Sequence, residues 1–282
     1  MKELRLKPKT TPDLPVEAET ISPDVFAGKE LSEIEGLPVH VGNQIHRLDD
    51  YFEVEGEVGG EAKDQHIIIE GDVPWLKYVG AKMTGGHIRV EGSVGMHVGS
   101  QMSGGEVIVK GSASDWAGAE MSGGLLRIKG DAGNLLGAAY RGSSEGMKGG
   151  CIVAEGDIGV EAGAFMRRGM IVVLGSTGPF AGAHMNGGEI FVFGRAGRRI
   201  GAEMKGNGGI IVCIGEVEAL LPTFVYDTTY KPTSTRLYLK ELRDELGIHE
   251  ATEFLDSSFS RYRGDLAVGG NGEILIVSRE SG

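Results

Sequence analysis

One phrase, Gly-x-x-Met-x-Gly-Gly-x-Ile-x-Val-x-Gly, recurs seven times between residues 80 and 215. Its methionines are 19 residues apart, except for one step of 26 that holds a seven-residue insertion around GAAYRGSSEG. The copies are 80–92, 99–111, 118–130, 144–156, 163–175, 182–194 and 201–215. A fixed period near twenty residues is typical of a solenoid, in which each repeat stacks on the one before it.

Each copy contains the parts of one tight turn and one short strand. The Gly-Gly pair permits backbone angles that other residues avoid, and the residues after it alternate, as Ile88 and Val90 do with polar neighbours. Such a strand cannot bury its inner face alone, so we expect successive strands to pair in parallel, about 4.8 Å apart. The pattern predicts an all-β fold: a single-stranded, right-handed parallel β-helix of about seven 19-residue turns.

The period aligns one methionine from every repeat. The column is Met83, Met102, Met121, Met147, Met166, Met185 and Met204. A column of thioethers suits a soft metal such as copper, but it also fills a core layer whose environment repeats, and we favour the core. The repeated glycines also resemble a dinucleotide fingerprint. We reject that interpretation, because the following helix and the acidic residue that it requires are absent from the sequence pattern.

Composition excludes several classes of function. The chain has a net charge of −12, which argues against binding to nucleic acid or to an anionic membrane surface. We find no secretory signal pattern and no run of eighteen apolar residues, so we expect a cytoplasmic protein.

The repeats divide the chain into three parts. Residues 1–50 are predicted as an edge strand at 1–9, an extended connector and a capping helix from Ser22 to about Ile34. Residues 51–215 hold the repeats, with 51–56 and 66–71 as irregular first turns. Residues 216–282 are predicted to contain a helix at 234–246 and a last strand at 273–277.

Groups that could carry chemistry are scattered. Cys151 and Cys213 lie 62 residues apart without a C-x-x-C motif, so neither an iron–sulfur cluster nor a zinc site is expected. Cys213 takes an inward strand position and Cys151 an outward one, so we expect no disulfide. The seven histidines show no ligand spacing. We therefore expect no catalytic, cofactor-binding or metal-binding residue on this chain.

Two surface features suggest contacts with a partner. The outward strand positions become apolar in the last three repeats, where Phe191 and Phe193 lie; such a face is covered either by the helix at 234–246 or by another protein of a complex. Arginines also cluster: Arg141, Arg167, Arg168, Arg195, Arg198, Arg199, Arg261 and Arg263. They form a solvated face, or they bind carboxylates of a partner or of a ligand.

The repeats, the interruption AAYRGSSEGMKGG (138–150), LLPTF (220–224) and the phrase RYRGDLAVGGNGEILI (261–276) together resemble the C subunit of formylmethanofuran dehydrogenase. The repeats by themselves are also similar to the carboxy-terminal β-helix of the glutamate synthase large subunit. Small departures from the pattern, such as Ser144 and Arg168 in place of glycines, affect local turns.

The resemblance implies a complex that reduces CO2 to formate and condenses the formate with methanofuran. It implies that a formate-dehydrogenase-like B subunit, with a small D subunit, holds a tungsten or molybdenum pterin and iron–sulfur clusters, and that an amidohydrolase-like A subunit holds two zinc ions. This chain is then a scaffold without a cofactor. The alternatives are the C subunit of a bacterial formyltransferase/hydrolase complex, or a glutamate-synthase-type module.

The insertion at 138–146 has no packing role in a 19-residue period, so we expect it to leave the body as a loop. It carries Tyr140 and Arg141, which are residue types enriched at the centres of interfaces. We predict that both contact another protein of the complex, and that alanine at both positions weakens assembly with little effect on the melting temperature.

Overall fold

The computed structural model describes residues 1–205 and 208–278. Gly206 and Asn207, which belong to the seventh repeat, and residues 279–282 lie outside the described residues.

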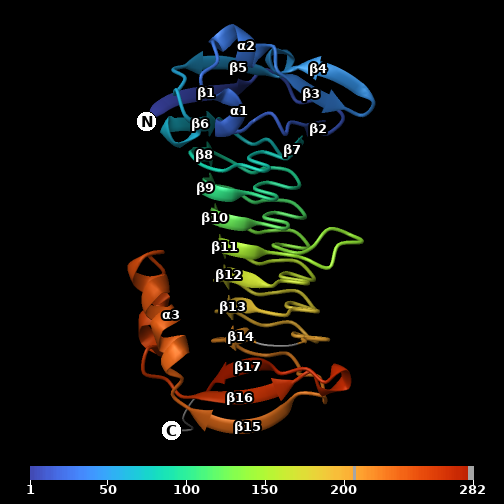
Figure 1. Cartoon of the computed structure of the whole chain (residues 1–282), viewed down its shortest axis with the longest axis vertical. Helices are drawn as coiled ribbons and strands as arrows, with labels where there is room; N and C mark the ends of the chain where they lie inside the picture. The colour runs from blue at the N-terminus through green and yellow to red at the C-terminus, as the bar shows by residue number, and fades with distance from the viewer. Residues whose placement is uncertain (206–207, 279–282) are drawn as a thin grey trace.

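Each repeat contributes one strand to a sheet of thirteen strands. The seven strands are β8 (His87–Val90), β9 (Ser103–Val109), β10 (Ser122–Ile128), β11 (Lys148–Ala154), β12 (Arg168–Val173), β13 (Gly188–Val192) and β14 (Gly209–Cys213). Each one pairs in parallel with the next, so the strands stack along the long axis of the molecule (Figure 1). The β-rich fold predicted from the sequence is confirmed.

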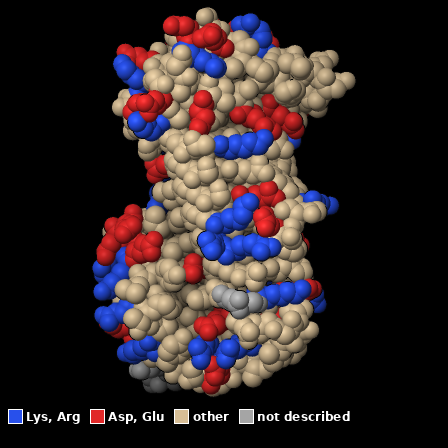
Figure 2. Space-filling model, viewed as in Figure 1, with Lys and Arg blue, Asp and Glu red and all other residues tan. Residues whose placement is uncertain are grey.

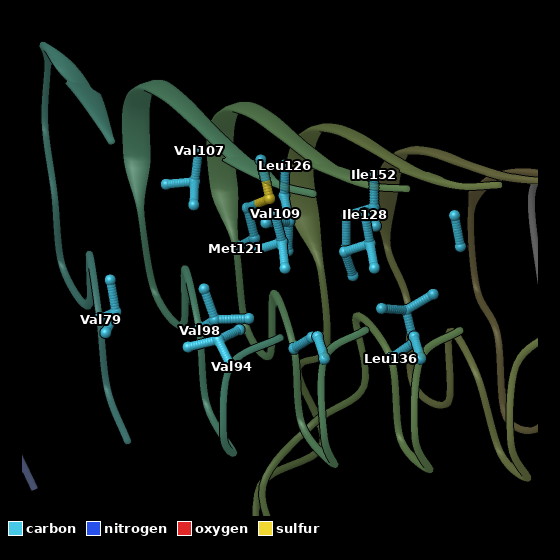
Figure 3. Packing of buried hydrophobic residues seen from close by; sticks show 14 of the residues in the cluster. Val79, Val94, Val98, Val107, Val109, Met121, Leu126, Ile128, Leu136 and Ile152 are labelled. Carbon is cyan, nitrogen blue, oxygen red and sulfur yellow. The ribbon is translucent and has the colours of Figure 1, made fainter. Parts of the chain in front are cut away.

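The register places equivalent residues of successive repeats beside one another. Val107 pairs with Leu126, Leu126 with Ile152, and Ile152 with Ile171. The seven methionines of the repeats are fully buried in the same core. Figure 3 shows Val107, Leu126 and Ile152 in one row, with Val98 and Leu136 on the opposite side of the interior. Stacking therefore gives every repeat apolar neighbours above and below, which a single repeat would lack.

A second, thinner ladder runs along the other side of each repeat. It consists of parallel bridges of one residue, such as Val94 with Ala113 and Ala113 with Ala132. The closing glycines of the strands lie close to this ladder. A Cβ atom on Gly130 would lie 2.5 Å from Ser112 Oγ, and one on Gly194 would lie 2.5 Å from the Gly175 carbonyl oxygen. Close approach between repeats is thus the reason for glycine at this point of the phrase.

The N-terminal part differs from the prediction at two places. β1 (Lys2–Pro8) is not an edge strand, because it lies between β5 (Phe52–Gly56) and β6 (Gln65–Ile69). β6 is parallel to β8 and so continues the stack, but β5 is antiparallel to β1 and is not a first turn of the repeats.

The predicted helix from Ser22 to Ile34 is also wrong. It is two short helices, α1 (Pro23–Phe26) and α2 (Leu31–Glu35), separated by Gly28 with a φ of 72° that an α-helix does not accommodate. A small sheet lies beside them, formed by β2 (Val16–Glu17), β3 (Pro38–Val41), β4 (Gln44–Arg47) and β7 (Leu76–Lys77), with 3-10 turns at Leu48–Asp50 and Ala62–Asp64. These elements cover one end of the stack (Figure 1).

At the other end, β17 (Gly272–Val277) pairs in parallel with β14, close to where a last strand is predicted. β15 (Val225–Tyr230) and β16 (Phe259–Gly264), which the sequence pattern does not reveal, extend the sheet in antiparallel fashion. Short 3-10 turns lie at His249–Phe254 and Leu266–Val268.

α3 (Thr233–Asp244) lies along the outer face of the sheet, as Figure 1 shows. Its Leu239 and Leu242 are fully buried in a second apolar cluster that contains Phe191 and Val212. The Tyr238 hydroxyl donates a 2.8 Å hydrogen bond to Glu189, and burial raises the pKa of Glu189. The apolar outer face is therefore covered by this chain's own helix, the first of the two alternatives.

Candidate interaction surface at the insertion

The insertion leaves the stack between β10 and β11 and projects beyond the neighbouring repeats (Figure 1). Its two ends are anchored by the ordinary bonding of the repeats, since Gly137 N–H donates to the Ala117 carbonyl and Lys148 N–H to the Met121 carbonyl. The intervening residues add backbone without disturbing the register, because β10 and β11 still pair in parallel. The loop is thus held at both ends by a regular framework.

A column of aromatic rings lies next to the insertion. Tyr78, His97 and Trp116 occupy equivalent corners of successive repeats, each with a φ between 58° and 66°. The Tyr78 and His97 rings stack with centroids 4.4 Å apart, and those of His97 and Trp116 are 5.5 Å apart. Left-handed backbone at three non-glycine corners is unfavourable, and ring stacking offsets part of that cost. This column was not predicted, although the 19-residue period aligns the three rings in the sequence.

Tyr140 folds back from the insertion onto the aromatic column. Its ring centroid lies 5.6 Å from that of His97 and 6.5 Å from that of Trp116. Its hydroxyl is 3.0 Å from Nδ1 of His97, and its backbone N–H donates to Glu120 at 3.2 Å. Burial lowers the pKa of His97 to about 4, so the imidazole is neutral near pH 7 and Nδ1 is able to accept a hydrogen bond from the Tyr140 hydroxyl. Tyr140 is therefore half-buried and fixed.

Two hollows lie on either side of Tyr140. One, of about 280 Å³, is lined by Tyr78, Lys82 and Gln101. The other, of about 370 Å³, lies beneath the insertion between Tyr140 and Phe165, with Arg141 and Glu161 in its lining. The second hollow combines apolar side chains with one positive and one negative charge.

The predicted arginines fall into separate groups. Arg141 is exposed on the insertion. Arg167 donates a 3.2 Å hydrogen bond to the Ser144 carbonyl and lies 4.0 Å from Glu145, while Arg168 beside it is exposed. These arginines belong to the insertion and to the turn that contacts it.

Arg198 and Arg199 lie further along the stack. Both are exposed, and the Arg199 guanidinium sits 5.5 Å from the centre of the Phe180 ring. Such a contact holds the long side chain against the corner of the preceding repeat.

The remaining predicted residues lie at the C-terminal end. Arg261 pairs with Asp227 and Glu273 and lies over the Tyr230 ring, so its charge is balanced within β15, β16 and β17. Arg263, also on β16, is exposed. Phe191 is fully buried and Phe193 partly buried under α3 and the following turn. Phe191 has no surface to offer a partner while α3 is in place.

The described residues contain no group of three or more His, Cys, Asp or Glu side chains arranged to hold a metal ion. Cys151 and Cys213 are free thiols, and burial raises the pKa of each to about 12, so neither is a reactive thiolate near pH 7. Among the described helices, none has the length and apolar character needed to cross a bilayer.

Known proteins resemble this chain in sequence and in structure. The C subunit of the tungsten-containing formylmethanofuran dehydrogenase 2 of Methanothermobacter marburgensis is 47% identical over 97 residues, 34% of this chain and 36% of that protein. The C subunit of the molybdenum-containing formylmethanofuran dehydrogenase 1 of Methanosarcina barkeri is 48% identical over 97 residues, 34% and 32% of the two chains. The match thus spans about a third of the length of these curated relatives. No protein-family model matches the chain.

A solved structure matches over the full length. A chain of the formyltransferase/hydrolase complex (FhcABCD) from Methylorubrum extorquens, crystallised with methylofuran, is 34% identical, with a TM-score of 0.89 over 98% of this chain and 100% of that chain. The repeat-built sheet and these relatives define a class of β-rich proteins that are parts of multi-subunit complexes. Within that class, the chain belongs to the family of the formylmethanofuran dehydrogenase C subunit.

Proposed function

We propose that this chain is a non-catalytic scaffold subunit that holds the catalytic subunits of a formylmethanofuran-converting complex in fixed relative positions. The observation that carries the proposal is the full-length correspondence with one chain of a formyltransferase/hydrolase complex, at 34% identity and a TM-score of 0.89. A stack of similar repeats is rigid and has a long surface, which suits a part that connects other proteins.

We further propose that the stack is a single-stranded, right-handed parallel β-helix. The sequence pattern assigns 51–215 to its body and 1–50 and 216–282 to its end parts; because β5 is antiparallel to β1, we assign β5 to the N-terminal end part and begin the body at β6. The parallel pairing of β8 to β14 and the second ladder of bridges support this architecture. The end parts prevent the open ends of the stack from associating with other chains.

The first candidate complex is a formylmethanofuran dehydrogenase, which reduces CO2 and condenses the formate with methanofuran. Sequence identity of 47% and 48% to subunits of tungsten- and molybdenum-containing enzymes supports it. The partners are then an amidohydrolase-like A subunit with two zinc ions, together with a formate-dehydrogenase-like B subunit and a small D subunit, which hold the pterin metal and iron–sulfur clusters. We place this complex in the cytoplasm.

The second candidate is a bacterial formyltransferase/hydrolase complex, which works without the redox step. The full-length structural match supports it, since the curated relatives match over a third of their length and this neighbour over its whole chain. The two candidates differ in their metals: the first complex contains tungsten or molybdenum, and the second does not.

Affinity purification of the tagged full-length chain from its native cells tests the proposal. We expect an amidohydrolase-like protein to co-purify, and metal analysis of the complex then distinguishes the two candidates. The chain expressed separately should contain no tungsten, zinc or iron in stoichiometric amount and should neither oxidise formate nor hydrolyse formylmethanofuran. One tightly bound metal ion per chain, or purification without any partner, contradicts the scaffold function.

A further inference from the structure

Four cations form a column along one edge of the stack: Lys148, Arg167, Arg168 and Lys205, here called the basic column. Lys148, Arg167 and Lys205 each directly follow a buried methionine of the repeats. Their backbone N–H groups donate to the carbonyl oxygens of Met121, Met147 and Met185, at 2.7, 2.9 and 3.0 Å. This bonding repeats from turn to turn, so the side chains start one above another, about 4.8 Å apart per turn.

The charge of the basic column is poorly balanced within the chain. In the first three repeats the same position holds Thr84, Ser103 and Ser122, and in the sixth it holds the neutral Asn186, so Arg167 and Lys205 lie two turns apart. Among the described residues, Glu145 is the one carboxylate within 4.0 Å of the column, at 3.7 Å from Lys148 and 4.0 Å from Arg167. No described carboxylate pairs with Arg168 or with Lys205, and both side chains are exposed. This local excess of positive charge occurs on a chain whose net charge is −12.

Arg168 departs from the packing rule of the repeats. The other repeats have glycine at this position. Gly85 in the first repeat has space around it, but at the four glycines of the second, third, fourth and sixth repeats a Cβ atom would approach the preceding turn closely. On Gly149 it would lie 2.4 Å from the Ser122 carbonyl oxygen, and on Gly187 it would lie 2.3 Å from that of Arg167. An arginine therefore lies at a position where four other repeats leave no room for a side chain.

The strand register adds a second cost at the same residue. Lys148 and Arg168 are direct partners in the ladder between β11 and β12, and like charges opposite one another destabilise a sheet. Glu145, 3.7 Å from Lys148, offsets part of this repulsion, but no described carboxylate pairs with Arg168. Local departures of this kind are expected at positions that have a function.

We propose that the basic column binds an extended acidic segment of a partner protein. The inference rests on the scaffold function above and specifies the chemistry of one contact. Figure 2 shows Lys and Arg side chains gathered over the middle of the stack and again near β14, on the face that it displays. From Lys148 to Lys205 the column covers three turns, about 14 Å, which an extended segment of about five residues would match. Guanidinium groups bind carboxylates in two-pronged fashion, which favours glutamate or aspartate side chains as the partner groups.

A peptide of about twelve residues with alternating glutamate and serine, labelled with fluorescein, is a suitable probe for the full-length chain. Its affinity is measured by anisotropy at about 50 and about 200 mM salt. The column variant carries Lys148→Gln, Arg167→Gln and Arg168→Gly. The control variant carries Lys231→Gln, Arg236→Gln and Lys240→Gln, which remove the same charge from exposed positions in and beside α3.

We expect the wild type and the control to bind the peptide, with affinity falling as salt rises, and the column variant to bind about tenfold more weakly. A glutamine–serine peptide should not bind. Absence of binding by the wild type, or equal binding by the column variant, overturns the proposal. So does equally tight binding of a thymidine oligonucleotide, which would indicate a surface for any polyanion.

Co-purification of the complex from cells is the second test of the basic column. The column variant should recover less of at least one partner than the control variant does, by about tenfold at the higher salt concentration. If the wild-type complex assembles and the column variant assembles equally well, the basic column is not a contact, and the scaffold function stands. If the wild type purifies without partners, the scaffold function itself fails. If the wild-type chain forms a dimer and the column variant does not, the basic column binds a second copy of this chain, and the proposal is overturned.

Discussion

The hydroxyl of Tyr140 and Nδ1 of His97 lie 3.0 Å apart, although 43 residues separate them in the sequence. The bond joins the insertion to a corner two repeats away and places the tyrosine ring against His97 and Trp116. The insertion is thus part of the packed surface near Tyr140 and projects beyond it at Arg141. Tyr140 and Arg141, which the sequence presents as equivalent contact residues, therefore have different environments.

Replacing Tyr140 should therefore affect folding, which changes the expectation that alanine at both positions leaves the melting temperature unaltered. We expect Tyr140→Ala to lower the free energy of unfolding by about 2 kcal/mol, because ring contacts and a hydrogen bond are lost. Tyr140→Phe should cost about 1 kcal/mol. Arg141→Ala, the matched control, should change stability by less than about 0.5 kcal/mol. Thermal and urea unfolding measure these differences, and equal stability of the two alanine variants would contradict the anchoring role.

The register of the repeats predicts the response of the methionine column. Met121 is fully buried, so Met121→Asp would place an unpaired carboxylate among apolar side chains and should cost several kcal/mol. Met121→Leu, which keeps volume and polarity, should cost less than about 1.5 kcal/mol. Circular dichroism and thermal unfolding of the two variants make the comparison. An aspartate variant as stable as the leucine variant would show that Met121 does not face the interior.

α3 offers a comparison within one helix. Leu239 is fully buried against the sheet, whereas Leu237 is 61% exposed. Leu239→Ala should lower the free energy of unfolding by about 2–4 kcal/mol and make the segment around α3 more sensitive to protease. Leu237→Ala should change either quantity little. If Leu237→Ala instead weakens co-purification of a partner, the outer face of α3 is itself in contact with another protein of the complex.

The repeating part of the chain was predictable because the same inner positions must be buried in each of the seven repeats. Each methionine and each inner aliphatic residue, such as Ile152 or Ile171, has the same neighbours in every repeat, so its burial follows from the period. The covering of Phe191 by α3 was foreseen as one of two alternatives, because an apolar face and an apolar helical stripe were both visible in the sequence.

The end parts were less predictable because their contacts do not repeat. β15 and β16 pair across 31 residues between Thr229 and Ser260, and no periodic pattern indicates that pairing. The break between α1 and α2 depends on the positive φ of Gly28, which a capping pattern does not reveal. The departure of the insertion from the stack as a loop was predictable from the interrupted period. The contact of Tyr140 with His97 was not, because it depends on how far the loop folds back.

The last prediction concerns pH. His97 is buried, and this burial, together with the charge of Lys77, lowers the pKa of its imidazole from 6.5 to about 4; Glu17 and Asp115 oppose the shift more weakly. Because the unfolded chain takes up this proton below pH 6.5 and the folded chain takes it up near pH 4, the folded state loses stability as pH falls between these values. The shift corresponds to about 3 kcal/mol over the whole window, and nothing is lost from this group above about pH 7. In His97→Asn the group cannot titrate, and asparagine tolerates the positive φ of this corner.

Carboxylates titrate in both proteins, so the quantity to measure is the difference in unfolding free energy between wild type and His97→Asn at several pH values from about 7 to about 4.5. That difference should shrink by about 2–3 kcal/mol as the pH is lowered, because the wild type alone loses the contribution of a neutral, buried imidazole. A difference that stays constant would show that His97 is not held neutral by its place beneath Tyr140.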